Sequence, residues 1–289
     1  MSKIITIKND SLEVNISTLG AEIVSVKKNG EEKIWQGDPK VWNGHAPILF
    51  PRCGCVWNGF YTLSGNRYEI GAHGFARKME YQVVAEEKTQ ATFLLESNDD
   101  TQKAYPFNFK FRVMFKLNGD TLGIYYIVEN HGDSTMYYNV GCHEAFITQN
   151  YVDGYFVKFD KEYDELDNSL LKDNFISLKT NKIKVGDEGV NLAEFFIPEN
   201  DGDSIIFEDI TSKRLSLFKG DKELVSIYYQ DFDHLVLWTE GGANFIAIEP
   251  WNGLPDVYGC DNQLETKKSI SKLDAKSSKT FYHSITFIE

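Results

Sequence analysis

Residues 107–128 read FNFKFRVMFKLNGDTLGIYYIV, and their pattern indicates the fold class. Apolar side chains occupy the odd positions from Phe107 to Leu117, and mostly polar side chains lie between them. This two-residue period is typical of a β-strand with one buried face. Asn118-Gly119-Asp120 has the composition of a tight turn, after which the alternation resumes from Leu122 to Val128. The stretch therefore predicts an antiparallel β-hairpin.

The same period recurs from one end of the chain to the other, in segments that begin at Leu12, Val225, Leu235, Ile246 and Phe281. Helical periodicity is nearly absent, because only residues 160–172 and 191–196 could hold short helical pieces, and neither is long enough for a βαβ crossover. The polar residues 160–189 have the composition of an elaborated loop rather than a linker. We therefore expect an all-β chain folded as one domain over residues 1–289, a large antiparallel β-sandwich.

Composition narrows the classes of partner and site. The chain has 289 residues with 30 Lys and Arg against 43 Asp and Glu, a net charge of −13 that argues against nucleic acid or an anionic membrane surface as a partner. No apolar run is long enough for a membrane span or a signal segment, so we expect a soluble, cytoplasmic protein. The four cysteines lack the paired spacing of a zinc site, which favours free thiols and no metal.

Four short segments combine titratable residues with glycine, proline or aromatics: Pro47–Gly54, His73–Arg77, Gly141–Phe146 and Glu249–Gly253. Such residues at strand ends often form binding sites. His143 could face a ligand, or could be a core histidine with a hydrogen-bond partner. Glu249 follows an apolar run, and Pro250 is expected to end that strand and leave the carboxylate at an open rim. There it could act as a base, or lie in water or in a salt bridge.

His73 and Arg77 share one short turn-like segment, in which Gly74 permits unusual backbone angles. An imidazole and a fixed cation at this spacing suit sugar hydroxyls or a phosphate, although an exposed loop is the alternative. His45 has no titratable partner nearby in the sequence, and we assign it no role.

Taken together and in this order, these segments resemble the aldose 1-epimerase (mutarotase) superfamily, in particular its branch of LacX-like proteins and hexose-6-phosphate epimerases. The resemblance also rests on Gly20-Ala21-Glu22-Ile23 and Tyr105-Pro106-Phe107, and it spans nearly the whole chain. It implies a galactose mutarotase-like β-supersandwich that exchanges the α and β anomers of a sugar or sugar phosphate without a cofactor.

The resemblance also implies roles for single residues. His143 is similar to the general acid that protonates the ring oxygen, and Glu249 to the general base that takes the proton of the C1 hydroxyl. His73 is similar to a second, sugar-binding histidine, and Asp203 to a hydroxyl-binding aspartate. Where many members carry an arginine, this chain has Cys55, so Arg52 or Arg77 is expected to supply the positive charge. An offset of three residues on a strand would point Arg52 to the opposite face.

Two other functions remain open at the level of sequence. The first is a carbohydrate-binding or sensing protein that keeps the pocket without turnover. The aromatic residues Trp57, Trp238 and Trp251 could stack on a sugar in either case, or pack in the core. The second is a polysaccharide lyase or hydrolase, against which the missing signal segment argues.

Overall fold

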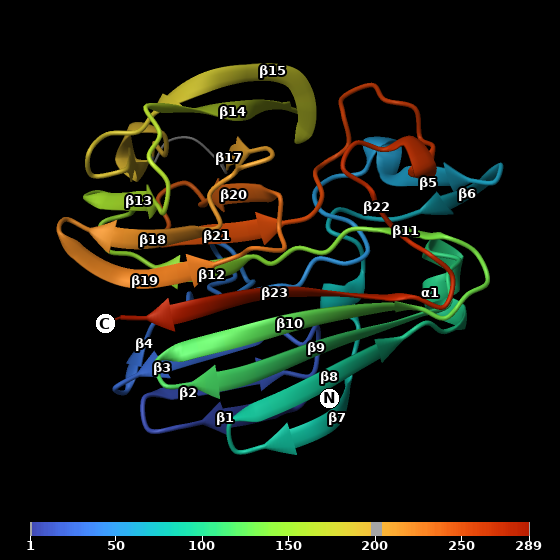
Figure 1. Ribbon diagram of the computed structural model, residues 1–289, viewed down its shortest axis with the longest axis horizontal. Helices are drawn as coiled ribbons and strands as arrows, with labels where there is room; N and C mark the ends of the chain where they lie inside the picture. The colour runs from blue at the N-terminus through green and yellow to red at the C-terminus, as the bar shows by residue number, and fades with distance from the viewer. Residues whose placement is uncertain (1, 198–203, 289) are drawn as a thin grey trace.

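The computed structural model describes residues 2–197 and 204–288, and antiparallel strands dominate this part of the chain (Figure 1). Its largest sheet has nine strands in the order β16-β13-β18-β19-β23-β10-β9-β8-β7. Their bounds in this order are Val190–Asn191, Tyr155–Phe159, Arg214–Lys219, Lys222–Tyr228, Ser278–Phe287, Thr121–Asn130, Phe109–Asn118, Gln90–Glu96 and Gln82–Glu87. The C-terminal strand β23 thus lies between β19 and β10, in the middle of the sheet.

Two four-stranded sheets complete the sandwich. The first follows chain order, β1 (Ile4–Lys8), β2 (Leu12–Ser17), β3 (Ile23–Lys28) and β4 (Glu31–Glu32). The second has the order β12 (Glu144–Ile147), β21 (Phe245–Trp251), β20 (His234–Trp238) and β17 (Ser204–Phe207). A continuous cluster of buried apolar side chains joins both of them to the nine-stranded sheet, and this cluster is the core of the all-β sandwich.

Small pairs of strands and a few short helices cover the ends of the sheets. The pairs are β5 (Phe60–Leu63) with β6 (Asn66–Glu69), β11 (Met136–Tyr138) with β22 (Ser271–Leu273), and β14 (Glu165–Lys172) with β15 (Phe175–Lys184). The described helices are α1 (Asp99–Ala104) and four 3₁₀ turns at Trp57–Gly59, Ala76–Lys78, Leu192–Glu194 and Leu264–Thr266. None of them, within residues 2–197 and 204–288, combines the length and apolarity that crossing a bilayer requires.

The predicted hairpin is confirmed. β9 and β10 pair in the register Leu117↔Leu122, with Asn118-Gly119-Asp120 at the turn. The predicted strands in the segments beginning at Leu12, Val225, Leu235, Ile246 and Phe281 are also present. These assignments succeed because each rests on a local period that one buried face imposes.

Residues 160–189 are more regular than expected. The helical alternative for 160–172 is wrong, because Glu165–Lys172 is strand β14 and pairs with β15. Asp173 and Asn174 join the two strands with positive φ angles of 52° and 66°, the conformation that a two-residue hairpin turn requires. The helical piece expected within 191–196 is confirmed as the 3₁₀ turn Leu192–Glu194.

The prediction that a strand ends at Glu249 is wrong. β21 runs through Pro250 to Trp251, and Glu249 is only 1% exposed rather than at an open rim. Proline is tolerated here because the neighbouring segment bonds to the Pro250 carbonyl, which accepts the Cys142 N–H at 3.2 Å. That segment needs no N–H donor from Pro250.

Candidate active site

His143 and Glu249 meet across two neighbouring strands. β12 and β21 pair with Glu144 opposite Ile248, and a bridge between Gly141 and Trp251 continues the same register. This register places His143 opposite Glu249, with both side chains on one face of the sheet. His143 Nε2 lies 3.3 Å from Glu249 Oε2. The fold thus brings together the two residues that the sequence proposed as acid and base.

A cavity of about 290 Å³ opens above this pair. It is lined by four of the predicted site residues, His143, Glu249, His73 and Arg77. Trp42, Trp238 and Trp251 form aromatic walls, and Leu171 and Asn174 reach it from the β14–β15 hairpin. Acid, base, cation and aromatic faces in one concave site are what a small polar ligand requires.

His73 is held in place by the packing of two loops. Phe75 N–H and Ala76 N–H both donate to the Phe50 carbonyl at 3.1 Å, and the Phe50 ring stacks on Phe111 of β9 with centroids 4.4 Å apart. Gly74 has a φ of 69°, and a Cβ there would lie 2.3 Å from the Phe50 oxygen. Only glycine fits at this close approach, so the segment is anchored to the core.

The tautomer of His73 follows from its hydrogen bond. Gly54 N–H donates to His73 Nδ1 at 3.2 Å, so Nδ1 is an acceptor and the neutral ring carries its proton on Nε2. Burial, reinforced by the charge of Arg77, lowers the pKa of His73 to about 3. His73 is therefore a neutral hydrogen-bond donor at the wall of the cavity.

Tryptophans fix the His143 ring. Trp42 stacks on it with centroids 5.0 Å apart and an interplanar angle of 24°, and Trp238 meets it edge-on at 5.3 Å. Trp251 lies 5.6 Å from the His73 ring and donates its Nε1 proton to the Cys142 carbonyl at 3.1 Å. Trp57 packs instead between Phe175 and Tyr258, away from this cavity.

Burial disfavours charge on either member of the pair. It lowers the pKa of His143 well below its ordinary value, an effect to which His73 and Arg77 add. It raises the pKa of Glu249 well above its ordinary value, and the negative charge of Glu144 adds to this. The arrangement that carries no net charge holds one proton between the two groups, on either the carboxylate or the imidazole.

The two arginines lie in different places. Arg77 lines the cavity, and its Nη2 donates to the Ala72 carbonyl at 3.2 Å. Arg52 is 1% exposed, donates to Asn139 Oδ1 at 2.7 Å, and pairs with Asp256 Oδ1 at 2.8 Å. It is not among the residues that line the cavity, whereas Cys55 is. Residues 51–56 do not form a strand, so the alternation of side chains between two strand faces does not decide where Arg52 points. Its buried pair with Asp256 holds Arg52 away from the cavity instead.

Two further expectations concern residues outside this geometry. Asp203 lies outside the described residues, although its neighbour Ser204 lines the cavity. His45 does not line the cavity, and its Nδ1 lies 3.6 Å from Glu22. Trp42, Leu171 and Asn174 were not predicted as site residues. Trp42 lies in a loop, Leu171 in strand β14 and Asn174 at a hairpin turn, and the sequence of these segments carries no sign of what they face.

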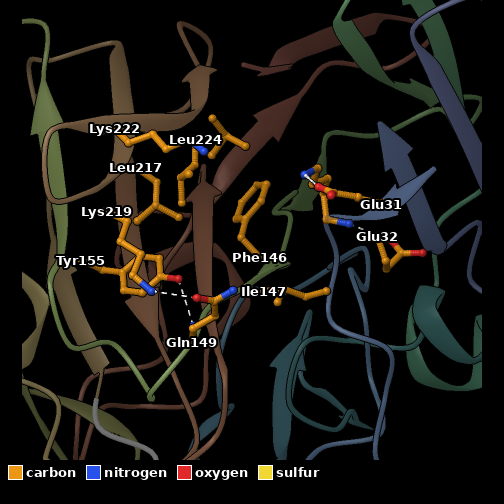
Figure 2. Close-up of a pocket in the computed structure, with 12 residues that line it drawn as sticks. Glu31, Glu32, Phe146, Ile147, Gln149, Tyr155, Leu217, Lys219, Lys222 and Leu224 are labelled. Atoms are coloured by element: carbon orange, nitrogen blue, oxygen red, sulfur yellow. Dashed lines mark hydrogen bonds and ion pairs between the residues drawn. The ribbon is translucent and has the colours of Figure 1, made fainter. Parts of the chain in front are cut away.

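A second hollow of about 340 Å³ lies elsewhere, beside β4, β12 and β19 (Figure 2). Phe146, Leu217 and Leu224 contribute apolar side chains to it, while Lys219 donates to Gln149 Oε1 at 2.9 Å. It contains none of the predicted site residues, and its charged side chains include Glu31 and Lys33, which pair with each other at 3.0 Å. The 290 Å³ cavity is therefore the candidate active site.

Comparison with known proteins shows the family to which the chain belongs. The family model described as aldose 1-epimerase matches residues 3–270. The chain belongs to the aldose 1-epimerase family. Among curated members, the chromosomal LacX protein of Lactococcus lactis is 31% identical over 294 residues, covering 96% of this chain and 97% of that protein.

Solved structures extend the comparison. The galactose mutarotase related enzyme of Lactobacillus acidophilus superposes with a TM-score of 0.89 at 30% identity, covering 99% of this chain and 98% of that one. A galactose mutarotase-like protein of Lactobacillus casei gives 0.91 at 27% identity, covering 98% and 99%. This aldose 1-epimerase family member is thus LacX-like and has the galactose mutarotase-like fold.

Proposed function

We propose that this aldose 1-epimerase family member interconverts the α and β anomers of a hexose or hexose phosphate by general acid and base catalysis. The observation that carries the proposal is the direct opposition of His143 and Glu249 at 3.3 Å within a cavity walled by tryptophan. A positioned acid and base within reach of two oxygens on one carbon is the arrangement that hemiacetal opening requires.

The proton steps balance without any redox change. The Glu249 carboxylate takes the proton of the C1 hydroxyl, the C1–O1 bond becomes a carbonyl, and the bond from C1 to the ring oxygen breaks. The ring oxygen receives its proton from the His143 imidazolium. Rotation about the C1–C2 bond and the reverse sequence then close the ring on the other face. Both groups return to their starting protonation states, so the reaction consumes no cofactor.

The protonation of the pair supports this assignment. The cycle starts from carboxylate and imidazolium, which together hold one proton, the same number as the neutral acid and imidazole. The hydroxyls of a bound sugar would offer hydrogen bonds to both charged groups in a site that otherwise disfavours charge. We infer that substrate binding shifts the shared proton from Glu249 to His143.

The walls of the cavity support a sugar ligand. Sugar rings present C–H faces that pack on aromatic rings and hydroxyl edges that need donors and acceptors. Trp42, Trp238 and Trp251 supply the first, while the Nε2 proton of His73 and the Arg77 guanidinium supply donors. The volume of about 290 Å³ suits a monosaccharide better than an extended oligosaccharide.

Arg77 is the residue that would contact a phosphate. Among the described residues that line the cavity, Arg77 is the only one that is a lysine or an arginine. An arginine can bind either hydroxyls or a phosphate. We therefore propose free hexoses and hexose 6-phosphates as the two substrate classes to compare. The buried Arg52 has no part in this proposal.

Exchange NMR on a panel of equilibrated free and phosphorylated aldoses tests the proposal. We expect magnetisation transfer between the α and β anomeric signals of at least one sugar far above the buffer rate. Calorimetry on the same panel separates the alternative of a carbohydrate-binding protein. Sugar binding without faster exchange would favour that alternative, and background exchange throughout would contradict epimerase activity.

A further inference from the structure

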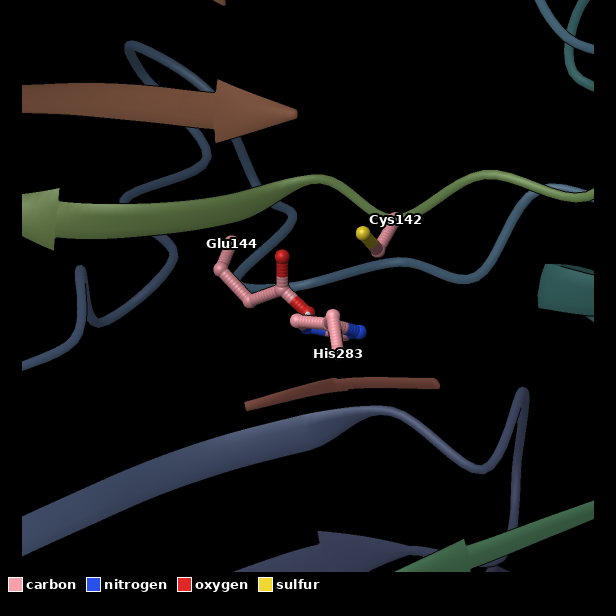
Figure 3. Close-up of side chains that lie close together, drawn as sticks. All are labelled: Cys142, Glu144 and His283. Carbon is pink, nitrogen blue, oxygen red and sulfur yellow. Dashed lines mark hydrogen bonds and ion pairs between the residues drawn. The ribbon is translucent and has the colours of Figure 1, made fainter. Parts of the chain in front are cut away.

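A second buried cluster lies behind the candidate catalytic pair. It consists of Cys142, Glu144 and His283, whose polar side-chain atoms lie within 4.8 Å of one another (Figure 3). Side chains alternate across an extended chain, so Cys142 and Glu144 point away from the face on which His143 lies. The cluster therefore contacts the core side of the same chain segment that presents His143 to the cavity.

Glu144 is held by a residue of the opposite sheet. Its Oε1 lies 3.0 Å from Nε2 of His283, which belongs to β23 in the nine-stranded sheet. The His283 ring is fully buried and lies parallel to the Tyr126 ring, with centroids 5.7 Å apart and an interplanar angle of 5°. A carboxylate buried among aromatic rings is costly without a donor, and His283 supplies one. This contact fastens the start of β12 to the core.

The same carboxylate places a charge near the base. Burial is the main reason why the pKa of Glu249 is raised, and the negative charge of Glu144 is the second. Glu249 also faces His143, and the Cys53 and Cys142 thiols, whose pKa values burial raises, feel its charge as well. His73 and Arg77 border the same cavity. Among these groups around Glu249, Glu144 is the one that also carries a carboxylate.

We propose that Glu144 and His283 form a positioning pair, which fixes the chain segment that carries His143 and places one negative charge behind Glu249. The inference rests on the proposed epimerase activity and goes one step beyond it. Neither residue is among those that line the cavity, so both act through the catalytic pair. The pair joins the four-stranded sheet of β12 to the nine-stranded sheet behind the candidate catalytic residues.

A metal ion is the competing explanation of this cluster. Cysteine, histidine and glutamate are all zinc ligands. The contacts favour the positioning pair, because the carboxylate and imidazole already bond to each other and Cys142 Sγ donates to the Pro250 carbonyl at 3.2 Å. Metal analysis of the purified chain is therefore part of the test.

The central variant is Glu144→Gln, which keeps the shape and an acceptor for His283 but removes the charge. The carboxylate of Glu144 favours the protonated form of the catalytic pair. Its loss should move the alkaline limb of the kcat/KM profile to lower pH by roughly 1 unit. Glu32→Gln is the matched control, because Glu32 is a partly buried carboxylate that accepts a hydrogen bond from Val26 N–H at 2.8 Å and lies outside the cavity.

Two substitutions at His283 separate positioning from mere packing. His283→Gln retains a donor near the Nε2 position and should keep a profile close to that of the wild type. His283→Phe removes the donor that holds the Glu144 carboxylate in place behind Glu249, so the alkaline limb should again move to lower pH. A purely structural role predicts lower melting temperatures for the His283 variants with no shift of the limb.

NMR titration of the His143 ring gives a second readout that does not need turnover. The pH dependence of its shifts should change in Glu144→Gln and stay unchanged in Glu32→Gln. An unchanged titration and an unchanged limb in folded Glu144→Gln would overturn the positioning pair, as would a metal bound at one per chain and lost in Cys142→Ser. An inactive wild type would contradict the epimerase proposal instead. The NMR titration of His143 would still decide whether Glu144 and His283 form a positioning pair.

Discussion

His143 lies opposite Glu249 in the register shared by β12 and β21, with Nε2 and Oε2 separated by 3.3 Å. The two groups face each other directly, so we expect them to act as one unit. One proton must leave the C1 hydroxyl as another reaches the ring oxygen. Loss of either His143 or Glu249 should therefore stop both proton transfers.

The first prediction concerns this unit. His143→Asn and Glu249→Gln should each lower kcat/KM by roughly 10²- to 10⁴-fold. The double variant should be about as active as the weaker single variant, because residues that act together are not additive. Anomer exchange rates of the three variants, with circular dichroism as a control for folding, test this. Losses that multiply would show that the two groups act independently.

The second prediction concerns pH. Burial opposes the doubly protonated pair, which has a net positive charge, and the unprotonated pair, which has a net negative charge. The acidic limb therefore lies below the ordinary pKa of histidine and the alkaline limb above that of glutamate. We expect a bell-shaped kcat/KM profile with a broad plateau, measured after subtraction of buffer catalysis. A single sigmoid through the ordinary histidine pKa would contradict a shared proton.

The third prediction concerns stability in acid. The pKa of His73 is about 3 in the folded chain and about 6.5 when unfolded, so only the unfolded chain gains a proton between these values. Stability from this residue is complete above pH 6.5 and is lost as the pH falls towards 3, by on the order of 3–5 kcal/mol. His73→Asn keeps an acceptor for Gly54 and tolerates the positive φ of 61°.

Urea unfolding measured between pH 6.5 and pH 3 checks this predicted loss of stability. The stability of His73→Asn should fall less steeply with acid than that of the wild type. His131→Asn is the matched control, since it makes the same change at an exposed histidine. Equal slopes for His73→Asn and the wild type would refute the buried, neutral state of His73.

The fourth prediction concerns Arg52. Asp256 is its buried partner and also pairs with Lys267, so Asp256→Asn leaves two cations without a counter-charge. We expect a loss of about 3–5 kcal/mol in unfolding free energy. Arg52→Met should alter stability but leave unchanged the ratio of KM values for a hexose and its 6-phosphate, whereas Arg77→Met should change that ratio if a phosphosugar binds. A change of this KM ratio in Arg52→Met would show that Arg52 contacts the substrate.

Local patterns account for what the sequence could predict. The hairpin at residues 107–128 follows from a period that needs no distant partner, and the segments around His143 and Glu249 carry titratable residues beside strands. Their opposition could not be predicted, because it depends on the register of strands far apart in the chain. Arg52 looked available for the same reason, since its partner Asp256 reaches it only in the fold. Trp42 gave no signal, because its loop shows no period.

Exchange NMR of the wild type beside Glu249→Gln, on whichever aldose the wild type turns over fastest, tests whether Glu249 is the catalytic base. Glu249→Gln keeps the size of the side chain but cannot accept the C1 hydroxyl proton. We expect rapid exchange between the α and β signals with the wild type and a rate reduced roughly 10²-fold or more in the folded variant. Equal exchange rates for the two proteins would contradict the assignment of Glu249 as the base.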